Sequence, residues 1–219
     1  MRIRDILLEP AVQLNESNTD GRINSSIDED TILKILDDTI PNLIKISKMR
    51  MWHDLCAFDE TRNIWIPINI KTSTFKSSDN VGNLSICAYA YTNIEMDLNK
   101  NYNSSQVHEQ LIDALKSKNY NNDVNRDYYF LVVNKLNPTE IIINSVRGLT
   151  KLTPNMSNLP FQVNWKYNRT FKIQPIEENI WQFTDCFKDK KIHWKEMFTG
   201  SMVLLTQKLE LATVKSDDD

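Results

Sequence analysis

The feature that most constrains the fold is an alternation of isoleucine with other residues in the stretch IWIPINIKTS, residues 64–73. Isoleucine occupies every second position from 64 to 70, which is the period of a β-strand that buries one face. The short apolar stretch WHDLCAF, residues 52–58, comes before it, and the polar stretch DETRN, residues 59–63, separates the two. This order predicts a β-hairpin whose second strand turns its isoleucines into the core.

Around the hairpin, the spacing of apolar residues predicts both helices and strands. Helices are expected over residues 1–50, 84–91, 104–118 and 193–213, and strands over residues 128–133, 140–146 and 159–168. The stretch YYFLVV, residues 128–133, is apolar on both faces, which is typical of a central strand. We therefore expect an α/β fold in which helices flank a modest sheet.

The length and composition suit one domain. The chain has 219 residues, of which 41% are apolar and 25% are charged, so it can bury a sizeable core. We expect a single domain over residues 1–219, with a helical N-terminal part over 1–50, a core over 52–168, a C-terminal helix over 193–213 and a disordered acidic tail over 215–219.

Glycine is scarce, and this excludes two large classes of nucleotide-binding protein. The four glycines are Gly21, Gly82, Gly148 and Gly200, which are too far apart for any two to share a GxGxxG or GxxxxGK[ST] loop. Rossmann and P-loop phosphate sites need such a loop, so we expect no nucleotide cofactor.

Other patterns bear on the location of the protein. No apolar run approaches the roughly 18 residues of a membrane-spanning helix, and the start MRIRDILLEP lacks the pattern of a signal peptide. The three cysteines are odd in number and widely spaced, which fits a reducing compartment better than a disulfide framework or a zinc knuckle. We expect a cytoplasmic protein that does not bind a membrane.

The hairpin also brings together side chains that can carry chemistry. Asp54 lies at the start of its first strand, and Asn69 and Lys71 lie near the end of the second. Antiparallel pairing places Asp54 near both, on the face opposite Ile68 and Ile70. A carboxylate, an amide and an ammonium group suit metal-assisted phosphodiester hydrolysis, because Mg²⁺ prefers oxygen ligands and a lysine can orient or deprotonate the attacking water.

These residues resemble the motif of the PD-(D/E)XK nucleases. His53-Asp54 stands where the family has Pro-Asp, and Asn69-Ile70-Lys71 stands where it has (Asp/Glu)-x-Lys. The wider stretch IPINIKTSTFKSSDN is similar to a subset of type II restriction endonucleases, in which a P-(I/V)-N-(I/V)-K strand is followed by a polar loop that contains Asp-Asn.

The resemblance covers residues 52–91, with weaker support from residues 159–168. It implies a restriction-endonuclease-like core, in which a central mixed β-sheet with a catalytic β-hairpin is flanked by helices, and a single nuclease domain whose catalytic core spans residues 52–168. It also implies a catalytic set of Asp54, Asn69 and Lys71, and a Mg²⁺ ion held by Asp54, Asn69 and the carbonyl of Ile70.

The chain departs from the family pattern at Asn69, which replaces the second carboxylate and removes one negative charge from the metal site. Three interpretations are open. Asn69 ligates the metal through its amide oxygen, or the carbonyl of Ile70 and a carboxylate from Glu16 or Glu29 complete the ligand set, or the site is weak or inactive.

The polar loop KSSDN that follows the catalytic strand is a candidate for DNA contact. Lys76, Ser78 and Asn80 can reach phosphates or base edges. Alternatively, Ser78 or Asp79 caps a helix that starts at Val81.

A second candidate lies within residues 141–175, which contain five basic residues and no acidic one. Gln162, Asn164 and Lys166 alternate along one face of the strand expected there, and Arg169 follows it. Glutamine and asparagine can read adenine in the major groove, and lysine can read guanine or phosphate. The alternative is a polar strand face that only contacts solvent.

The leading hypothesis is a type II restriction endonuclease that makes Mg²⁺-dependent, sequence-specific double-strand cuts in DNA as a homodimer, since two active sites are needed to cut two strands. The alternatives are a repair or mobile-element nuclease of the same fold, a catalytically inactive DNA-binding protein and an unrelated α/β interaction protein. The formal net charge of −3 does not exclude DNA, because residues 61–78 and 141–175 together carry eight basic residues and no acidic one.

Overall fold

The computed structural model describes residues 3–8, 12, 14, 21–155 and 160–188. Its main feature is a five-stranded sheet with the order β1-β2-β3-β5-β6. The strands are β1 (Ile44–Ile46), β2 (Leu55–Asp59), β3 (Ile64–Ser73), β5 (Tyr129–Asn134) and β6 (Asn137–Ser145). β3 and β5 are parallel and the other neighbours are antiparallel, so the sheet is mixed and the predicted α/β class is confirmed.

The hairpin predicted from the isoleucine alternation is formed by β2 and β3. Its register runs from Leu55 opposite Ile68 to Asp59 opposite Ile64. The predicted central strand and its neighbour are confirmed too, because β5 lies between β3 and β6.

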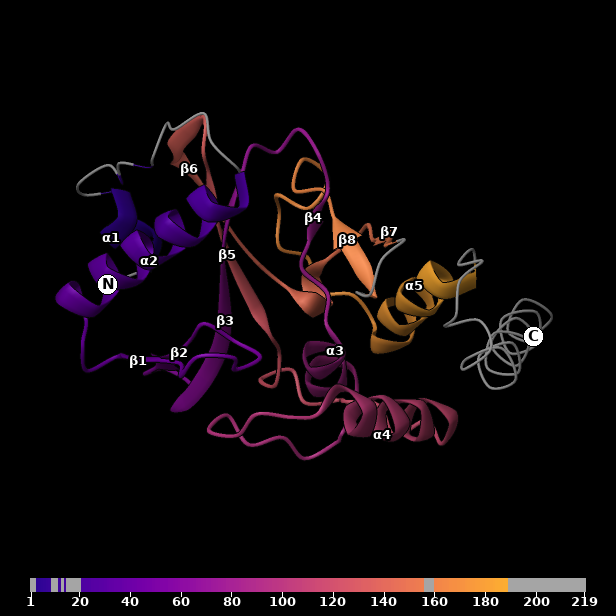
Figure 1. Cartoon of the computed structure of the whole chain (residues 1–219). Coiled ribbons are helices and arrows are strands. Elements are labelled where there is room, and N and C mark those ends of the chain that lie inside the picture. The colour runs from indigo at the N-terminus through magenta and orange to yellow at the C-terminus, as the bar shows by residue number, and fades with distance from the viewer. Residues whose placement is uncertain (1–2, 9–11, 13, 15–20, 156–159, 189–219) are drawn as a thin grey trace.

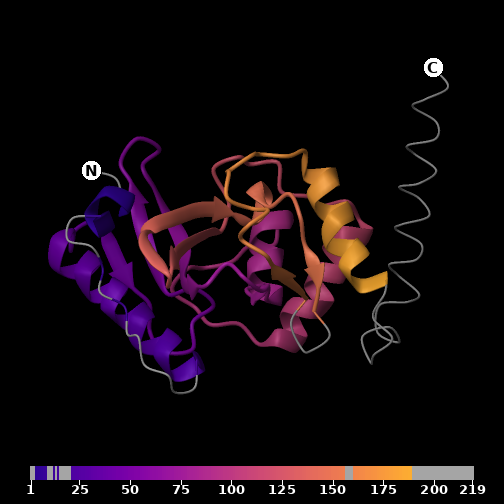
Figure 2. The same ribbon diagram turned by 90° about the horizontal axis from the view of Figure 1, so that it is seen from above.

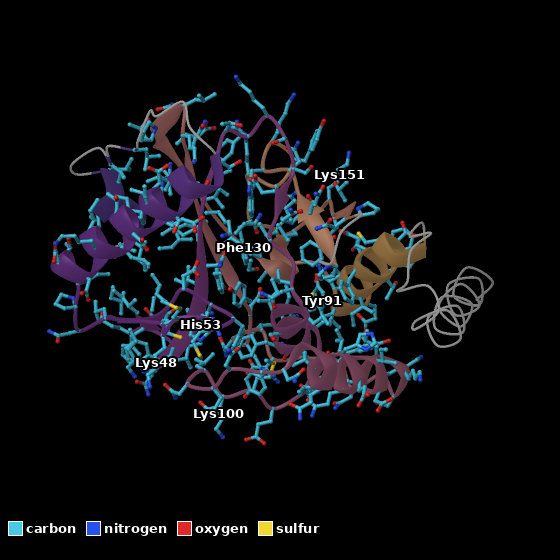
Figure 3. All side chains as sticks on the ribbon, in the orientation of Figure 1. Lys48, His53, Tyr91, Lys100, Phe130 and Lys151 are labelled. Carbon is cyan, nitrogen blue, oxygen red and sulfur yellow. The ribbon has the colours of Figure 1, made fainter. Side chains whose placement is uncertain are left out.

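Helices lie on both sides of the five-stranded sheet (Figures 1 and 2), and a hydrophobic cluster lies on each of its faces. Helices α1 (Ile3–Leu8) and α2 (Gly21–Thr39) cover one face, where the isoleucines of β3 pack in an aliphatic cluster. Helices α3 (Leu84–Tyr91), α4 (Ser104–Lys116) and α5 (Ile176–Lys188) lie on the side of the other face, whose cluster is rich in aromatic rings. Phe130, labelled in Figure 3, belongs to this cluster and packs against the rings of Tyr128 and Trp165. The alternation of β3 therefore decides which of its side chains face α2 and which face the aromatic cluster.

A second, three-stranded sheet corrects one prediction. It has the order β4-β8-β7, with β4 (Asp79–Asn80), β8 (Phe161–Val163) and β7 (Thr153–Pro154). The strand expected over residues 159–168 is only three residues long, because the Asn164 side chain accepts a hydrogen bond from the Lys166 N–H at 3.0 Å and the chain turns. This turn places Trp165 in the aromatic cluster, 5.6 Å from Phe130 between ring centroids.

The start of α3 corrects another prediction. The helix begins at Leu84 rather than Val81, and its cap is Asn83, whose side chain accepts a hydrogen bond from the Ile86 N–H at 3.0 Å. Neither Ser78 nor Asp79 caps it, because Asp79 belongs to β4.

Of the remaining predicted segments, one helix is confirmed, one is corrected, and others lie outside the described residues. The helix expected over residues 104–118 is confirmed as α4, whereas residues 1–50 also contain the strand β1, and α5 was not predicted. The expected helix over 193–213, the acidic tail over 215–219 and Glu16 lie outside the described residues. None of the helices in the described part of the chain is both long and apolar enough to span a membrane.

Candidate active site

The candidate site forms where β2 ends and β3 continues. The last residue pair of the hairpin joins Leu55 and Ile68, so residues 69–73 of β3 have no strand partner on that side among the described residues. Asp54 precedes β2 and extends the pairing by one bond, from its N–H to the Ile68 carbonyl at 3.0 Å. Its side chain then takes the place of a strand, because Oδ2 accepts a hydrogen bond from the Ile70 N–H at 2.7 Å.

Helix α2 adds a second carboxylate to this edge. Glu29 accepts a hydrogen bond from the backbone N–H of Thr72, the next edge-facing residue of β3. Its Oε1 also lies 3.3 Å from the Nζ of Lys71, and both side chains keep about a quarter of their surface exposed, at 23% and 25%. We call Glu29, Asp54, Ile70 and Lys71 the β3 edge site.

The backbone carbonyl of Ile70 points toward the same edge. In a β-strand the N–H and C=O of one residue leave the chain on the same side. Because the Ile70 N–H donates to Asp54, the Ile70 carbonyl is directed to the side that carries the two carboxylates. The expected backbone ligand thus faces Asp54 and Glu29.

Burial makes the β3 edge site receptive to a cation. It raises the pKa of Asp54, against the opposing effects of Lys71 and the Ile70 N–H. Burial also raises the pKa of Glu29, and the charge of Asp54 raises it further while Lys71 lowers it. Two partly buried carboxylates that repel each other are stabilised by a positive charge between them.

By the alternation of β3, Asn69 lies on the same face as Lys71, opposite Ile68 and Ile70. Its amide group is beside the Tyr128 hydroxyl, which in turn donates a hydrogen bond to the Trp52 carbonyl at 2.9 Å. The Oδ1 of Asn69 is buried and accepts no hydrogen bond within the described residues. The structure therefore brings Asp54 and Lys71 together with Glu29, and directs the amide of Asn69 toward the aromatic cluster.

The oxygen atoms of the β3 edge site are of the type that a hard cation such as Mg²⁺ prefers as ligands. Among the described residues, no group of three or more His, Cys, Asp or Glu side chains could hold a metal ion. Mg²⁺ needs fewer, since it is usually bound by one or two carboxylates and retains several waters. Glu29, Asp54 and the Ile70 carbonyl provide oxygen ligands of this type, and the unpaired Oδ1 of Asn69 is a further candidate.

His53, which occupies the position of the family's proline, has a structural environment. Its Nε2 lies 2.9 Å from the Leu98 carbonyl, which can only accept, so Nε2 carries the proton and Nδ1 accepts from the Ser47 hydroxyl at 2.5 Å. Burial lowers the pKa of His53, so the ring is neutral at pH 7. In Figure 3 it lies above the loop that carries Lys100. These bonds hold the start of β2, and with it Asp54.

Three charged residues near this site, Asp28, Asp79 and Lys135, were not predicted as site residues from the sequence. Lys135 follows β5, and its Nζ lies 3.3 Å from Oδ2 of Asp28 and 3.0 Å from Oγ of Ser25, both on α2. Asp79 interacts electrostatically with both Lys71 and Lys135, and burial raises its pKa. Ser25 and Lys135 are 110 residues apart, so no local pattern signals their contact.

The residues predicted to contact DNA do not form one row. Asn80 and Gln162 are opposite each other in β4 and β8, and the Oδ1 of Asn80 accepts hydrogen bonds from Gln162 and Asn155, each at 2.8 Å. We call Asn80, Asn155 and Gln162 the amide cluster. The expected alternation of Gln162 with Asn164 and Lys166 along one strand is wrong, because β8 ends at Val163.

The other predicted contacts lie outside the amide cluster. Lys76 and Lys166 are exposed, and Ser78 and Asn164 are partly buried. Arg169 forms an ion pair with Glu140, and its guanidinium lies 5.5 Å from the centroid of the Phe75 ring.

Comparison with known proteins does not add a relative to this picture. No model of a protein family matches the chain, and no curated protein sequence is similar to it.

Proposed function

We propose that this protein is a Mg²⁺-dependent DNA endonuclease of the restriction type, which acts in the cytoplasm and makes sequence-specific double-strand cuts. The observation that carries the proposal is the β3 edge site, in which two carboxylates, a backbone carbonyl and the ammonium group of Lys71 meet where a hairpin strand loses its partner. The resemblance of residues 52–91 to the PD-(D/E)XK nucleases supports the same reaction class.

The proposed roles follow from the charges. Asp54, Glu29 and the Ile70 carbonyl hold the cation, which, when bound, polarises the phosphate and lowers the pKa of a water ligand. Lys71 lies beside Glu29, where its ammonium group orients the attacking water and offsets the charge that builds up on the phosphate oxygens. The water oxygen bonds to phosphorus and gives up a proton to solvent, the ester P–O bond breaks, and the leaving oxygen takes up a proton from solvent.

The proposed partner is double-stranded DNA, bound by a homodimer. One chain carries one β3 edge site, and two cuts in opposite strands need two such sites. A two-fold dimer matches the symmetry of a palindromic sequence.

The proposal is tested by incubating the purified protein with plasmid and phage DNA of varied sequence. Discrete fragments are expected with Mg²⁺, and none with EDTA. Asp54→Ala and Lys71→Ala are expected to abolish the fragments while DNA binding in Ca²⁺ stays nearly intact. If wild-type protein with Mg²⁺ leaves every DNA uncut, the endonuclease proposal is wrong. Nicking or cleavage that depends on DNA structure would indicate a repair or mobile-element nuclease instead.

A second candidate function is sequence-specific DNA binding without cleavage. Asn69 favours it, because this residue removes one negative charge from the family's metal site and its amide faces Tyr128. Wild-type protein that binds DNA in Ca²⁺ but never cuts it in Mg²⁺ or Mn²⁺ would establish this alternative.

A further inference from the structure

Two neighbouring ion pairs join α2 to the sheet. Asp28 and Glu29 are consecutive on the helix, and each pairs with a lysine at 3.3 Å, Asp28 with Lys135 and Glu29 with Lys71. The lysines come from β3 and from the residue after β5, and these strands are parallel neighbours, so both lysines lie toward the same end of the sheet. The Lys135 N–H donates to the Ser73 carbonyl at 2.8 Å, which fixes its backbone to the end of β3.

The environment of Lys135 differs from that of an ordinary surface lysine. Its side chain keeps 19% of its surface exposed, and Asp28 is fully buried. The carboxylate of Asp79 interacts with the charges of Lys71 and Lys135 alike, so the two ammonium groups are near a common neighbour. Lys135 is therefore a second positive group beside the β3 edge site.

The arrangement leaves Lys135 able to bind one more acceptor. An ammonium group has three N–H donors. The Ser25 hydroxyl accepts from one of them at 3.0 Å, and Asp28 is an ion-pair partner at 3.3 Å, so a remaining donor can reach an oxygen of an incoming anion. Stability alone is a weak reason for such a pair, because desolvation of two charges offsets most of their attraction.

We propose that Lys135 is a phosphate-contacting residue of the same site, which binds a backbone phosphodiester of the DNA next to the scissile one. The inference rests on the proposed function, since it names a DNA contact of that enzyme. Asp28 and Ser25 hold the ammonium group in position before DNA binds, and Lys71 serves the reacting phosphate. Lys135 thus extends the positively charged track from the reacting phosphate to its neighbour.

The test is the salt dependence of DNA binding in Ca²⁺, compared between wild type, Lys135→Gln and Lys135→Arg. Loss of one phosphate contact lowers the slope of log affinity against log salt by about 0.9, which is a roughly tenfold loss of affinity near 0.1 M salt. Lys135→Gln is expected to show both effects on all DNA sequences alike, and Lys135→Arg is expected to keep the wild-type slope. Lys34→Gln is the matched control, because Lys34 is also paired with an aspartate of α2 but is 75% exposed.

The possible outcomes distinguish failure of the endonuclease proposal from failure of the proposed role of Lys135. If wild type binds no DNA, both the endonuclease and the phosphate contact are wrong. If wild type binds or cuts DNA and Lys135→Gln has the same affinity and slope, only the role of Lys135 is wrong, even if the variant melts at a lower temperature. Should Lys135→Gln fail to fold, Asp28→Asn decides: loss of the carboxylate that holds the ammonium group in position is expected to weaken DNA binding several-fold, and unchanged binding would overturn the inference.

Discussion

The sequence assigned Asp54 and Lys71 of the β3 edge site and Asn80 and Gln162 of the amide cluster to one function, yet the chain builds the two regions in different ways. At the β3 edge, charged groups meet because one strand outruns its partner, and Asp54 and Glu29 occupy the vacant edge positions at Ile70 and Thr72. In the amide cluster, neutral side chains from three segments satisfy one another, with Asn80 accepting from both neighbours. The carboxylates of the β3 edge site can still accept a cation, whereas the side chains of the amide cluster form their hydrogen bonds with one another.

This difference shows which kind of site suits catalysis and which suits the recognition of bases. A site that binds a cation must keep repelling carboxylates near each other, which burial makes unfavourable in the free protein. A site that reads bases needs amides held in fixed positions, and mutual hydrogen bonds provide that. The variants below separate these two roles, in order of decreasing effect.

Lys71→Ala should give the largest effect. Removal of the ammonium group that pairs with Glu29 is expected to reduce the cleavage rate by roughly a thousandfold or more. Single-turnover cleavage of a plasmid measures it, and binding in Ca²⁺ checks that the loss is in the reaction. Lys166→Ala is the control from the second region, because Lys166 is exposed. Equal losses from the two variants would contradict the assignment of the reaction to the β3 edge.

Asn168→Ala should give the next effect, on stability. This buried side chain accepts from the N–H groups of Thr150 and Lys151, at 2.9 and 3.2 Å, and donates to the carbonyls of Lys151 and Asn164, at 2.9 and 3.1 Å. Its loss leaves two N–H groups and two carbonyls of this partly buried turn without their partner, so urea unfolding is expected to show a destabilisation of about 2 kcal/mol. A change below about 0.5 kcal/mol, as for a typical surface substitution, would mean that the turn after β8 does not depend on Asn168.

Gln162→Ala should have a smaller effect, on sequence discrimination. If the amide cluster reads base edges, loss of one amide is expected to relax discrimination at one position by about 1–2 kcal/mol. Competition between cognate and single-mismatch DNA in Ca²⁺ measures it. Lys71→Ala, in turn, should leave discrimination unchanged. A uniform loss of affinity for every sequence would show that Gln162 supports binding but does not read a base.

Asp54→Asn should have the smallest effect on stability, visible as a change in the pH dependence of stability. Because burial raises the pKa of Asp54 above its ordinary 3.8, the folded protein holds a proton there that the unfolded chain has already lost. Stability therefore falls as pH rises through the interval between the two pKa values, and the penalty remains at neutral pH. The variant lacks this penalty, and its amide oxygen can still accept from the Ile70 N–H.

Thermal melting of both proteins at several pH values tests this expectation. In the absence of divalent cations, Asp54→Asn should melt above wild type at pH 7, and the difference should shrink as pH approaches 4. Added Mg²⁺ should raise the melting temperature of wild type alone. A variant that melts below wild type at pH 7 would show that the Asp54 charge stabilises the free protein.

The sequence by itself determined the elements whose order and register are local. The isoleucine alternation and the short polar turn before it specify the β2–β3 hairpin, because a short turn leaves little freedom in how two strands pair. That register is enough to place Asp54 beside Ile70 and near Lys71. The apolar spacing of residues 104–118 was likewise enough to predict α4, and the apolar residues on both faces of 128–133 were enough to predict β5, because both patterns are local.

Only the tertiary structure decided the contacts between distant segments. Glu29 was one of two candidate carboxylates, and its selection depends on how α2 packs across the sheet, 42 residues from Lys71. The early end of β8 depends on β4, a two-residue partner some 80 residues earlier, and on the aromatic cluster that receives Trp165. Strand period predicts which way side chains point, but it cannot say where a strand stops, because the packing energy of a distant partner decides that.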